Sequence, residues 1–162
     1  MKKFFCLHGL PRAGNTLLGS IINQNPKVAV TANSLIADML GELNLLKHTD
    51  IFKNFPDYKS FDNVTKSLIQ TYYKDWPQDY IIDRAPWGIP VNLKALREVQ
   101  KDIKIIVLVR DVEEILASFI KWSEKEPTSF VNQYEAKTIE EKYPILALEP
   151  ITAPANGEQP TV

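Results

Sequence analysis

Hydrophobic residues along this chain fall into two kinds of segment: short continuous runs and longer stretches with helical spacing. Residues 4–8 form a short apolar run that stops at a turn rich in Gly and Pro, which predicts a buried strand. After the turn, Leu17, Leu18 and Ile21 recur at the spacing of one helix face. The same reasoning predicts further strands over 28–31, 80–82 and 104–109, and helices over 16–23, 35–46, 61–75, 91–100 and 112–125.

Polar residues mark where some of these helices begin. Ser34 and Asp111 precede two of the helices and are suited to cap them, and Glu114 adds the spacing of a capping box to the second. Residues 47–59 have no periodicity and predict an irregular segment, whereas residues 128–142 predict a polar helix.

The order of these elements predicts the fold class. Continuous apolar strands that alternate with helices are typical of a parallel sheet whose two faces are both covered. We therefore expect an α/β fold, a three-layer, P-loop-like parallel β-sheet with helices on both faces. Residues 1–142 are expected to form one domain, and residues 143–162, which lack periodicity, an irregular and flexible tail. The few predicted strands imply a small sheet with an exposed edge.

Composition narrows the classes of partner. The chain has 162 residues, of which 44% are hydrophobic, and a net charge of −1. No global field therefore attracts it to nucleic acid or to an anionic membrane, so any phosphate binding must be local. No apolar run approaches the roughly 20 residues that span a bilayer, and the N-terminal run is too short for a signal peptide. We expect a cytoplasmic protein without nucleic-acid or membrane partners, with Cys6 as a buried apolar side chain.

The turn after the first strand carries the clearest chemical signal. Residues 9–16, here called the phosphate loop, nearly match the ATP-binding pattern G-x-x-x-x-G-K-[ST]. Asn15 replaces the lysine of that pattern, and the loop's cation is Arg12, which follows Pro11. Backbone N–H groups and the helix dipole at such a turn favour an anion. A plain strand-to-helix turn would also suit Gly and Pro, but Arg12 before Gly14 favours anion binding.

Two more cations follow strands of the predicted sheet. Arg110 comes directly after the strand over 104–109, where open α/β sheets bind ligands, and Ser118 lies about two helical turns further on. The alternative is an Arg110 paired with Asp111 or Glu114. Arg84 follows the strand over 80–82, so arginines 12, 84 and 110 together predict a focused polyanion pocket.

Three segments resemble the nucleotide-binding half of sulfotransferases that use 3′-phosphoadenosine 5′-phosphosulfate (PAPS). Residues 10–18 resemble the 5′-phosphosulfate loop of the bacterial branch, GLPR[SA]G-x-TLL. Residues 105–119 resemble the family's 3′-phosphate motif, which has an Arg and a Ser at this separation. Residues 83–87 resemble the central D-[KR]-x-P segment. The resemblance covers about residues 3–125.

The resemblance implies transfer of a sulfuryl group from PAPS to a hydroxyl or amine, with 3′,5′-diphosphoadenosine (PAP) as product and no metal. Arg12 and Arg84 would stabilise the charge that grows on the departing and transferred oxygens, and Asp83 is our choice of proton acceptor. Arg110 and Ser118 would hold the 3′-phosphate. The residues expected around the 5′-phosphosulfate are Pro11, Arg12, Ala13, Gly14, Asn15, Thr16 and Leu17.

Several points stay open at this stage. His8, Asp38 and Glu42 are other candidates for the proton acceptor. The family's C-terminal helical portion and its basic, Gly-containing lid have no counterpart after Lys142, so we expect a less sequestered site with slow or absent turnover. The acceptor, whether a small molecule, a glycan or a peptide, is not identified. Its side of the site is expected along the helix over 35–46, the aromatic segment Phe52–Tyr58 and Trp87.

Two other functions remain as alternatives. One is a non-catalytic or partner-dependent module that binds PAP or PAPS. The other is a divergent P-loop kinase, against which Asn15 argues because the lysine that reaches the outer phosphates is missing. An uncovered sheet edge also keeps a homo-oligomer open.

Overall fold

The computed structural model describes residues 2–125 together with residues 138 and 141. The predicted helix over 128–142 and the predicted tail over 143–162 therefore lie outside the described residues, apart from those two positions. The chain divides into two compact units. We call Met1–Gly9 with Asn15–Val107 the sheet unit, and Leu10–Gly14 with Leu108–Val162 the loop unit.

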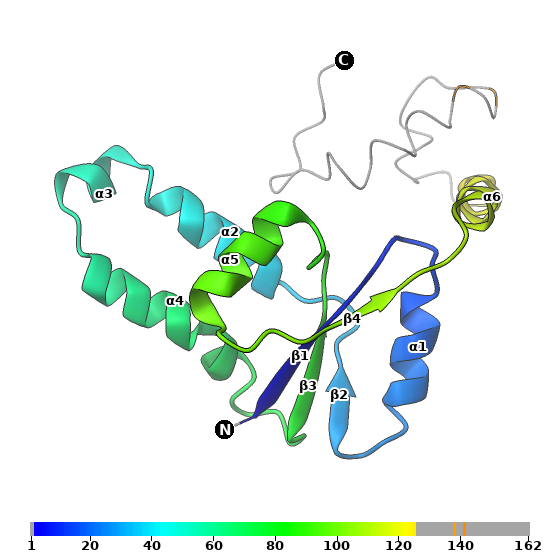
Figure 1. Ribbon diagram of the computed structural model, residues 1–162, viewed down its shortest axis with the longest axis horizontal. Helices are drawn as coiled ribbons and strands as arrows, with labels where there is room; N and C mark the ends of the chain where they lie inside the picture. Colours follow the sequence, from blue (N-terminus) through cyan, green and yellow to red (C-terminus); the bar gives the residue numbers. More distant parts are fainter. Residues whose placement is uncertain (1, 126–137, 139–140, 142–162) are drawn as a thin grey trace. The chain divides into compact units, whose positions relative to one another are not determined.

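A parallel sheet with the strand order β2-β3-β1-β4 organises the sheet unit (Figure 1). β1 (Lys3–Gly9) pairs with β3 (Tyr80–Arg84), and β3 pairs in turn with β2 (Val28–Val30). The register aligns Leu7 with Arg84. On the other side of β1, the Cys6 N–H donates to the carbonyl of Lys104, at the approach to β4 (Ile105–Leu108). The carboxyl ends of β1 and β3 therefore meet at the same edge of the sheet.

Side chains that alternate along the strands fill two separate apolar layers. Phe4, Cys6 and Ile81 belong to a core that also contains side chains of α2 (Ile36–Leu46), α4 (Tyr58–Tyr72) and α5 (Pro90–Val99). The second core contains Leu7, Val30 and Ile82, and residues of α1 (Asn15–Ile22) pack against it. The two layers confirm the predicted three-layer α/β fold, with helices on both faces of a parallel sheet (Figure 1).

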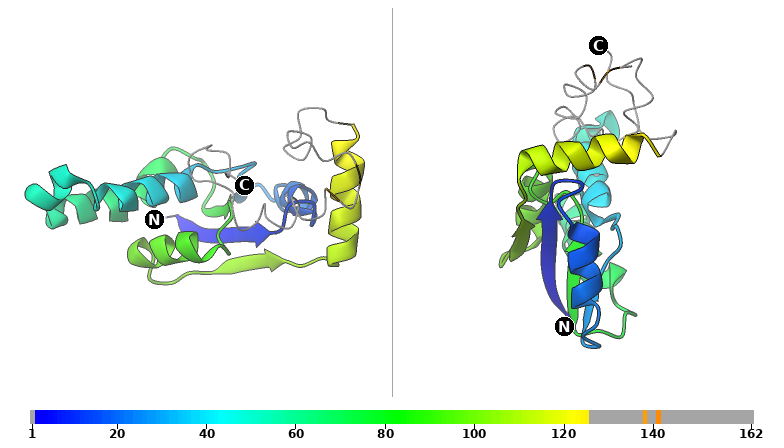
Figure 2. Two further views of the ribbon diagram at one scale, coloured as in Figure 1. Left: turned by 90° about the horizontal axis from the view of Figure 1, so that it is seen from above. Right: turned by 90° about the vertical axis from the view of Figure 1, so that its right-hand side faces the viewer.

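Helix ends depart from the predicted boundaries where side chains cap them. The predicted irregular segment contains a short helix, α3 (Asp50–Asn54), because Thr49 Oγ1 accepts a hydrogen bond from the Phe52 N–H. α4 begins at Tyr58 rather than near 61, because Asp57 accepts from the Ser60 N–H. Figures 1 and 2 show α2 and α4 side by side, with α3 joining their far ends.

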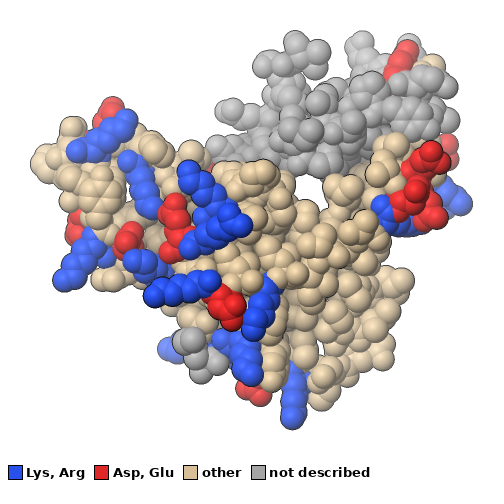
Figure 3. Space-filling model, viewed as in Figure 1, with Lys and Arg blue, Asp and Glu red and all other residues tan. Residues whose placement is uncertain are grey.

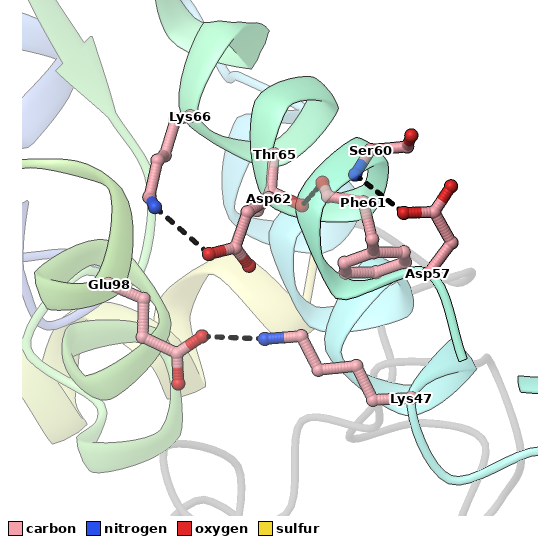
Figure 4. A network of polar contacts seen from close by, with 8 residues as sticks. All are labelled: Lys47, Asp57, Ser60, Phe61, Asp62, Thr65, Lys66 and Glu98. Carbon is pink, nitrogen blue, oxygen red and sulfur yellow. Dashed lines mark hydrogen bonds and ion pairs between the residues drawn. The ribbon is translucent and has the colours of Figure 1, made fainter. Parts of the chain in front are cut away.

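Charged side chains gather on this helical part of the sheet unit, whereas α1 carries none (Figure 3). Figure 4 shows two of the ion pairs: Lys47, after α2, lies 3.0 Å from Glu98 of α5, and Lys66 lies 2.9 Å from Asp62 within α4. These pairs are substantially exposed to solvent, so each adds little to stability. None of the helices in the part of the chain that the structure describes is long and apolar enough to cross a bilayer.

The loop unit is built on α6 (Val112–Ser123). Asp111 caps this helix as predicted and accepts from the N–H groups of Glu113 and Glu114. Ile115 and Phe119 on the buried side of α6 pack with Ala13 of the phosphate loop. This apolar contact attaches the loop segment to the helix.

The strand expected over 104–109 is shorter and more exposed than its apolar sequence predicts. β4 ends at Leu108, and the exposed fractions of Val107 and Val109 are 57% and 83%. Strand order accounts for this exposure, because among the described strands β4 stands at an edge of the sheet, next to β1.

Candidate functional site

The phosphate loop has an unusual backbone at the residue that carries its charge. Arg12 has a φ of 65°, and Gly14 has a φ of 107°. Ala13 donates its N–H to the carbonyl of Leu10 at 3.0 Å, which closes a tight turn around Arg12. Gly tolerates this region, but a non-glycine residue there costs about 1 kcal/mol or more and persists only where its surroundings hold it.

Two residues of the α6 region hold Arg12 in place. Arg110 Nη1 donates to the carbonyl of Arg12 at 3.0 Å. Arg12 Nε donates to the hydroxyl of Ser118 at 3.2 Å. The structure thus brings together the arginine of the loop and the Arg and Ser that the sequence assigned to a second phosphate. Arg110 also makes the alternative contact, an ion pair from Nε to Glu114 at 2.8 Å.

Exposure leaves both guanidinium groups within reach of a ligand. Arg12 and Arg110 are exposed, whereas Ser118 is partly buried beneath Arg12. A guanidinium carries several N–H donors in a planar fork that matches phosphate oxygens. The loop unit can therefore present two guanidinium groups and a hydroxyl to the anionic groups of a ligand.

Asn15 binds the main chain of the loop, unlike the lysine that the ATP-binding pattern has at this position. Its Nδ2 donates to the carbonyl of Gly9 at 2.9 Å, so the side chain ties the two ends of the phosphate loop together within the sheet unit. A lysine here would reach outward to phosphate. The asparagine instead fixes the main chain from which α1 begins.

We expect Asn15→Ala to loosen the loop and to weaken anion binding by roughly fivefold to tenfold, because a net hydrogen bond of about 1 kcal/mol is lost. Calorimetric titration with PAP would measure the change. Asn23→Ala is a suitable contrast, since Asn23 hydrogen-bonds both the N–H and the carbonyl of Val30, away from the loop. Equal PAP affinity in Asn15→Ala and the wild type would contradict the role of this bond.

Both the side chain and the main chain of Arg84 are hydrogen-bonded. The side chain contacts the start of α1, and the main chain contacts the segment after β2. Its Nη1 donates to Thr16 Oγ1 at 2.8 Å, which places a cation beside the last residue of the phosphate loop. Its N–H donates to Thr31 Oγ1 at 2.7 Å, and its carbonyl accepts from the Ser34 N–H at 3.1 Å. Thr31 and Ser34, both in the segment between β2 and α2, therefore fix the backbone of Arg84, a role that the sequence analysis did not assign to them.

Asp83, the predicted proton acceptor, is enclosed by side chains of the sheet unit. Its side chain is fully buried, and its carboxylate accepts from Trp87 Nε1 at 2.9 Å and from the Tyr73 hydroxyl. Burial raises the pKa of the Asp83 carboxyl, while hydrogen bonds from Ser34, Tyr73 and Trp87 oppose the shift. Trp87 is fully buried as well, so the expectation that it lines the acceptor side is wrong.

The raised pKa of Asp83 gives a pH dependence of known sign. A carboxyl with a folded-state pKa above its unfolded value of about 3.9 contributes stability below that value and loses it as pH rises through the folded pKa. We expect the unfolding free energy of the wild type to fall, relative to that of Asp83→Asn, as pH rises above about 4. Urea unfolding of both proteins across this range measures the difference. If the difference in unfolding free energy between the two proteins stays constant with pH, or changes in the opposite direction, the pKa of Asp83 is not raised.

The other candidates for a proton acceptor differ in their surroundings. His8, near the end of β1, is partly buried, and its Nδ1 is buried without a hydrogen-bond partner among the described residues. Burial lowers the pKa of His8, opposed by a hydrogen bond to the main chain of Ala85. Asp38 and Glu42 lie exposed on α2. Of these three candidates, His8 is the nearest in sequence to the phosphate loop, which begins at Gly9.

Comparison with protein families decides the assignment. A model of the sulfotransferase family matches residues 5–146. The chain belongs to the sulfotransferase family. This match confirms the resemblance, and it spans the phosphate loop, Arg84 and α6 of this sulfotransferase domain. No curated protein sequence matches the chain.

Sequence reasoning missed the residues that act through hydrogen bonds with distant partners. Tyr73, Thr31 and Ser34 support the segment around Arg84, but the sequence predicts only a helix around Tyr73, a strand that includes Thr31 and a helix cap at Ser34. Ser34 does accept from the Ile36 N–H at 3.0 Å, although the residue directly before α2 is Leu35. No local pattern signals such partners, because the packing of separate elements creates them.

Proposed function

We propose that this protein transfers a sulfuryl group from PAPS to a hydroxyl or amine acceptor and releases PAP. The observation that carries the proposal is the cluster of Arg12, Arg110 and Ser118, in which the loop cation is bonded both to the serine and, through its carbonyl, to the second arginine. A donor with a 5′-phosphosulfate and a 3′-phosphate requires two anion sites, and ATP requires no site for a 3′-phosphate.

In the proposed complex, residues 11–17 receive the 5′-phosphosulfate, and Arg110 with Ser118 receives the 3′-phosphate. Asn15 and Thr16, the last two residues of the loop, begin α1, and the dipole at a helix N-terminus favours negative charge. Because the site is local, it agrees with the small net charge of −1.

The proposed chemistry is an in-line displacement at sulfur. The acceptor oxygen or nitrogen forms a bond to sulfur, the bond between sulfur and the bridging oxygen breaks, and that oxygen leaves with PAP. The acceptor's proton passes to a basic group of the protein. Arg12 and Arg84 would stabilise the negative charge that develops on the bridging and sulfuryl oxygens.

The alternative of a module that binds PAP without catalysis shares the same cluster and differs only in turnover. A P-loop kinase is less well supported, because Asn15 bridges the loop ends instead of offering an ammonium group to phosphates. Calorimetric titration with PAP, PAPS and ATP, followed by a sulfate-transfer assay on a mixed acceptor panel, separates these functions. Tighter binding of ATP than of PAP would refute the proposal, and PAP binding without transfer to any acceptor would favour the module.

Arg110→Ala tests the 3′-phosphate site directly. We expect PAP binding to weaken about 10- to 100-fold, since a charge-assisted contact to phosphate is lost. The affinity for adenosine 5′-phosphosulfate, which lacks the 3′-phosphate, should fall much less. Its loss should reflect only the hydrogen bond by which Arg110 holds the Arg12 carbonyl. Equal losses for the two nucleotides, measured by calorimetry, would mean that Arg110 only supports the loop.

A further inference from the structure

Asp83 is a buried carboxylate for which the proposed chemistry has no direct use. It is the last but one residue of β3, and its side chain is fully buried in the sheet unit. Burying such a group is costly unless its oxygens are paired, and in this case both accept a hydrogen bond. An apolar residue could fill the space without that cost, so the carboxylate calls for another explanation.

Tyr73 and Trp87, which both donate to Asp83, come from different elements. Tyr73 is the C-cap residue directly after α4, and Trp87 lies in the turn that leads from β3 to α5. Both side chains are fully or almost fully buried, with exposed fractions of 1% and 0%. Asp83 therefore joins the end of a helix to the turn that follows its own strand.

The same network reaches Arg84 through Ser34. The Tyr73 hydroxyl lies 3.3 Å from Ser34 Oγ, and the Ser34 N–H donates to the carbonyl of Arg84. Thr31 holds the N–H of Arg84, so both main-chain polar groups of Arg84 have partners. The side chain that this backbone presents is the one bonded to Thr16.

We propose that Asp83 is a positioning residue: its hydrogen bonds from Tyr73 and Trp87 fix the turn after β3 and thereby keep the Arg84 guanidinium at Thr16. The inference rests on the proposed function in one respect, because Arg84 acts on the transferred group only if the protein is a sulfotransferase. Displacement of a positioned group by about 1 Å can cost on the order of 100-fold in rate. The network is thus expected to affect turnover more than nucleotide affinity.

The chemistry of the two donors predicts different effects for two conservative variants. In Asp83→Asn, Oδ1 can still accept from Trp87, and Nδ2 can donate to the Tyr73 oxygen while the Tyr73 hydrogen turns to Ser34. This variant keeps the hydrogen bonds and loses the negative charge. In Tyr73→Phe, the carboxylate loses the hydrogen bond from the Tyr73 hydroxyl, and the link from that hydroxyl to Ser34 disappears.

The experiment compares Tyr73→Phe, Asp83→Asn and the control Tyr72→Phe, which removes the hydroxyl of the neighbouring, 39% exposed tyrosine. Hydrogen exchange of the amides of residues 84, 85, 87 and 88 is measured first, and it requires no activity. We expect exchange about fivefold faster or more in Tyr73→Phe, as the loss of one buried hydrogen bond allows, and little change in the other two proteins.

Kinetics on the folded fraction of each protein form the second readout. We expect kcat of Tyr73→Phe to fall about 10- to 100-fold with the Kd of PAP within about threefold of the wild type, and kcat of Asp83→Asn to stay within about fivefold. Unchanged exchange in Tyr73→Phe would overturn the inference. So would loss of all transfer in Asp83→Asn with normal exchange, because Asp83 would then be the proton acceptor.

Failure of the proposed function has a separate signature. If the wild type neither binds PAP nor transfers sulfate, the sulfotransferase proposal and the effect of Arg84 on turnover both fail. The exchange comparison still decides whether Asp83 fixes the turn. If the wild type is active and Tyr73→Phe is as active as Tyr72→Phe, the positioning role alone is refuted.

Discussion

Arg12→Gly is expected to slow sulfate transfer strongly while leaving the protein at least as stable as Arg12→Ala. The side chain supplies the cation of the phosphate loop, and its loss should lower the transfer rate by about 100- to 1,000-fold. The backbone of Arg12 lies in the left-handed region, with a φ of 65°, which Gly adopts without strain and Ala does not. We expect Arg12→Gly to exceed Arg12→Ala in unfolding free energy by about 1 kcal/mol.

This comparison separates charge from backbone strain. PAP affinity, transfer rate and urea unfolding are measured for both variants and for Arg97→Ala, which removes an exposed arginine in the last turn of α5. Arg97→Ala should bind PAP and turn over as the wild type does. If Arg12→Gly retains wild-type transfer, the loop cation has no part in the reaction. If Arg12→Ala is the more stable of the two, the backbone at residue 12 is not strained.

Gly88→Ala is expected to destabilise the protein by about 1–3 kcal/mol, the usual cost of forcing extra atoms into a filled site. A Cβ added at Gly88 would lie 2.2 Å from Cδ2 and 2.3 Å from Nε2 of the His8 ring. Gly88 does not have a positive φ, so the penalty would come from this overlap and not from the backbone. Thermal and urea unfolding measure the effect.

Gly41→Ala is the matched control for this prediction. Nothing lies within 4 Å of a Cβ added there, and Gly41 lies inside α2, where Ala is preferred by about 0.5–1 kcal/mol. The two Gly→Ala changes should therefore have opposite signs. In His8→Ala, the substitution at Gly88 should cost much less than in the wild type. A Gly88→Ala protein as stable as the wild type would show that the His8 ring moves aside freely.

Local signals were sufficient to predict the part of the fold that carries the phosphate loop. The apolar run at residues 4–8, the Gly-rich turn and the spacing of Leu17 and Ile21 predicted β1 and α1 to within one residue at each end. Asp111 was recognised as a cap because a capping side chain acts on amides only two and three residues away. Neighbours in sequence determine such features, and sequence patterns therefore reveal them.

Features that depend on tertiary neighbours were not predictable in the same way. The apolar sequence of β4 matches that of a central strand, and only the strand order shows that it stands at an edge. Asp83 looked available for proton transfer because its sequence position is at a strand end. Its burial beneath Trp87 and Tyr73 follows from the packing of α4 and the turn against β3. α3, with five residues, is too short to produce a periodic pattern.

Cys6 offers a way to observe binding without altering the chain. Its side chain is 1% exposed in β1, and burial, together with the charge of Asp83, raises the pKa of the thiol. Thiol reagents attack the thiolate, so an alkylating label should react only when the sheet opens. The labelling rate then reports the free energy of that opening. A nucleotide that binds only the folded protein should slow labelling as the fraction of occupied protein rises. The labelling rate of the single cysteine therefore measures the affinity for the nucleotide.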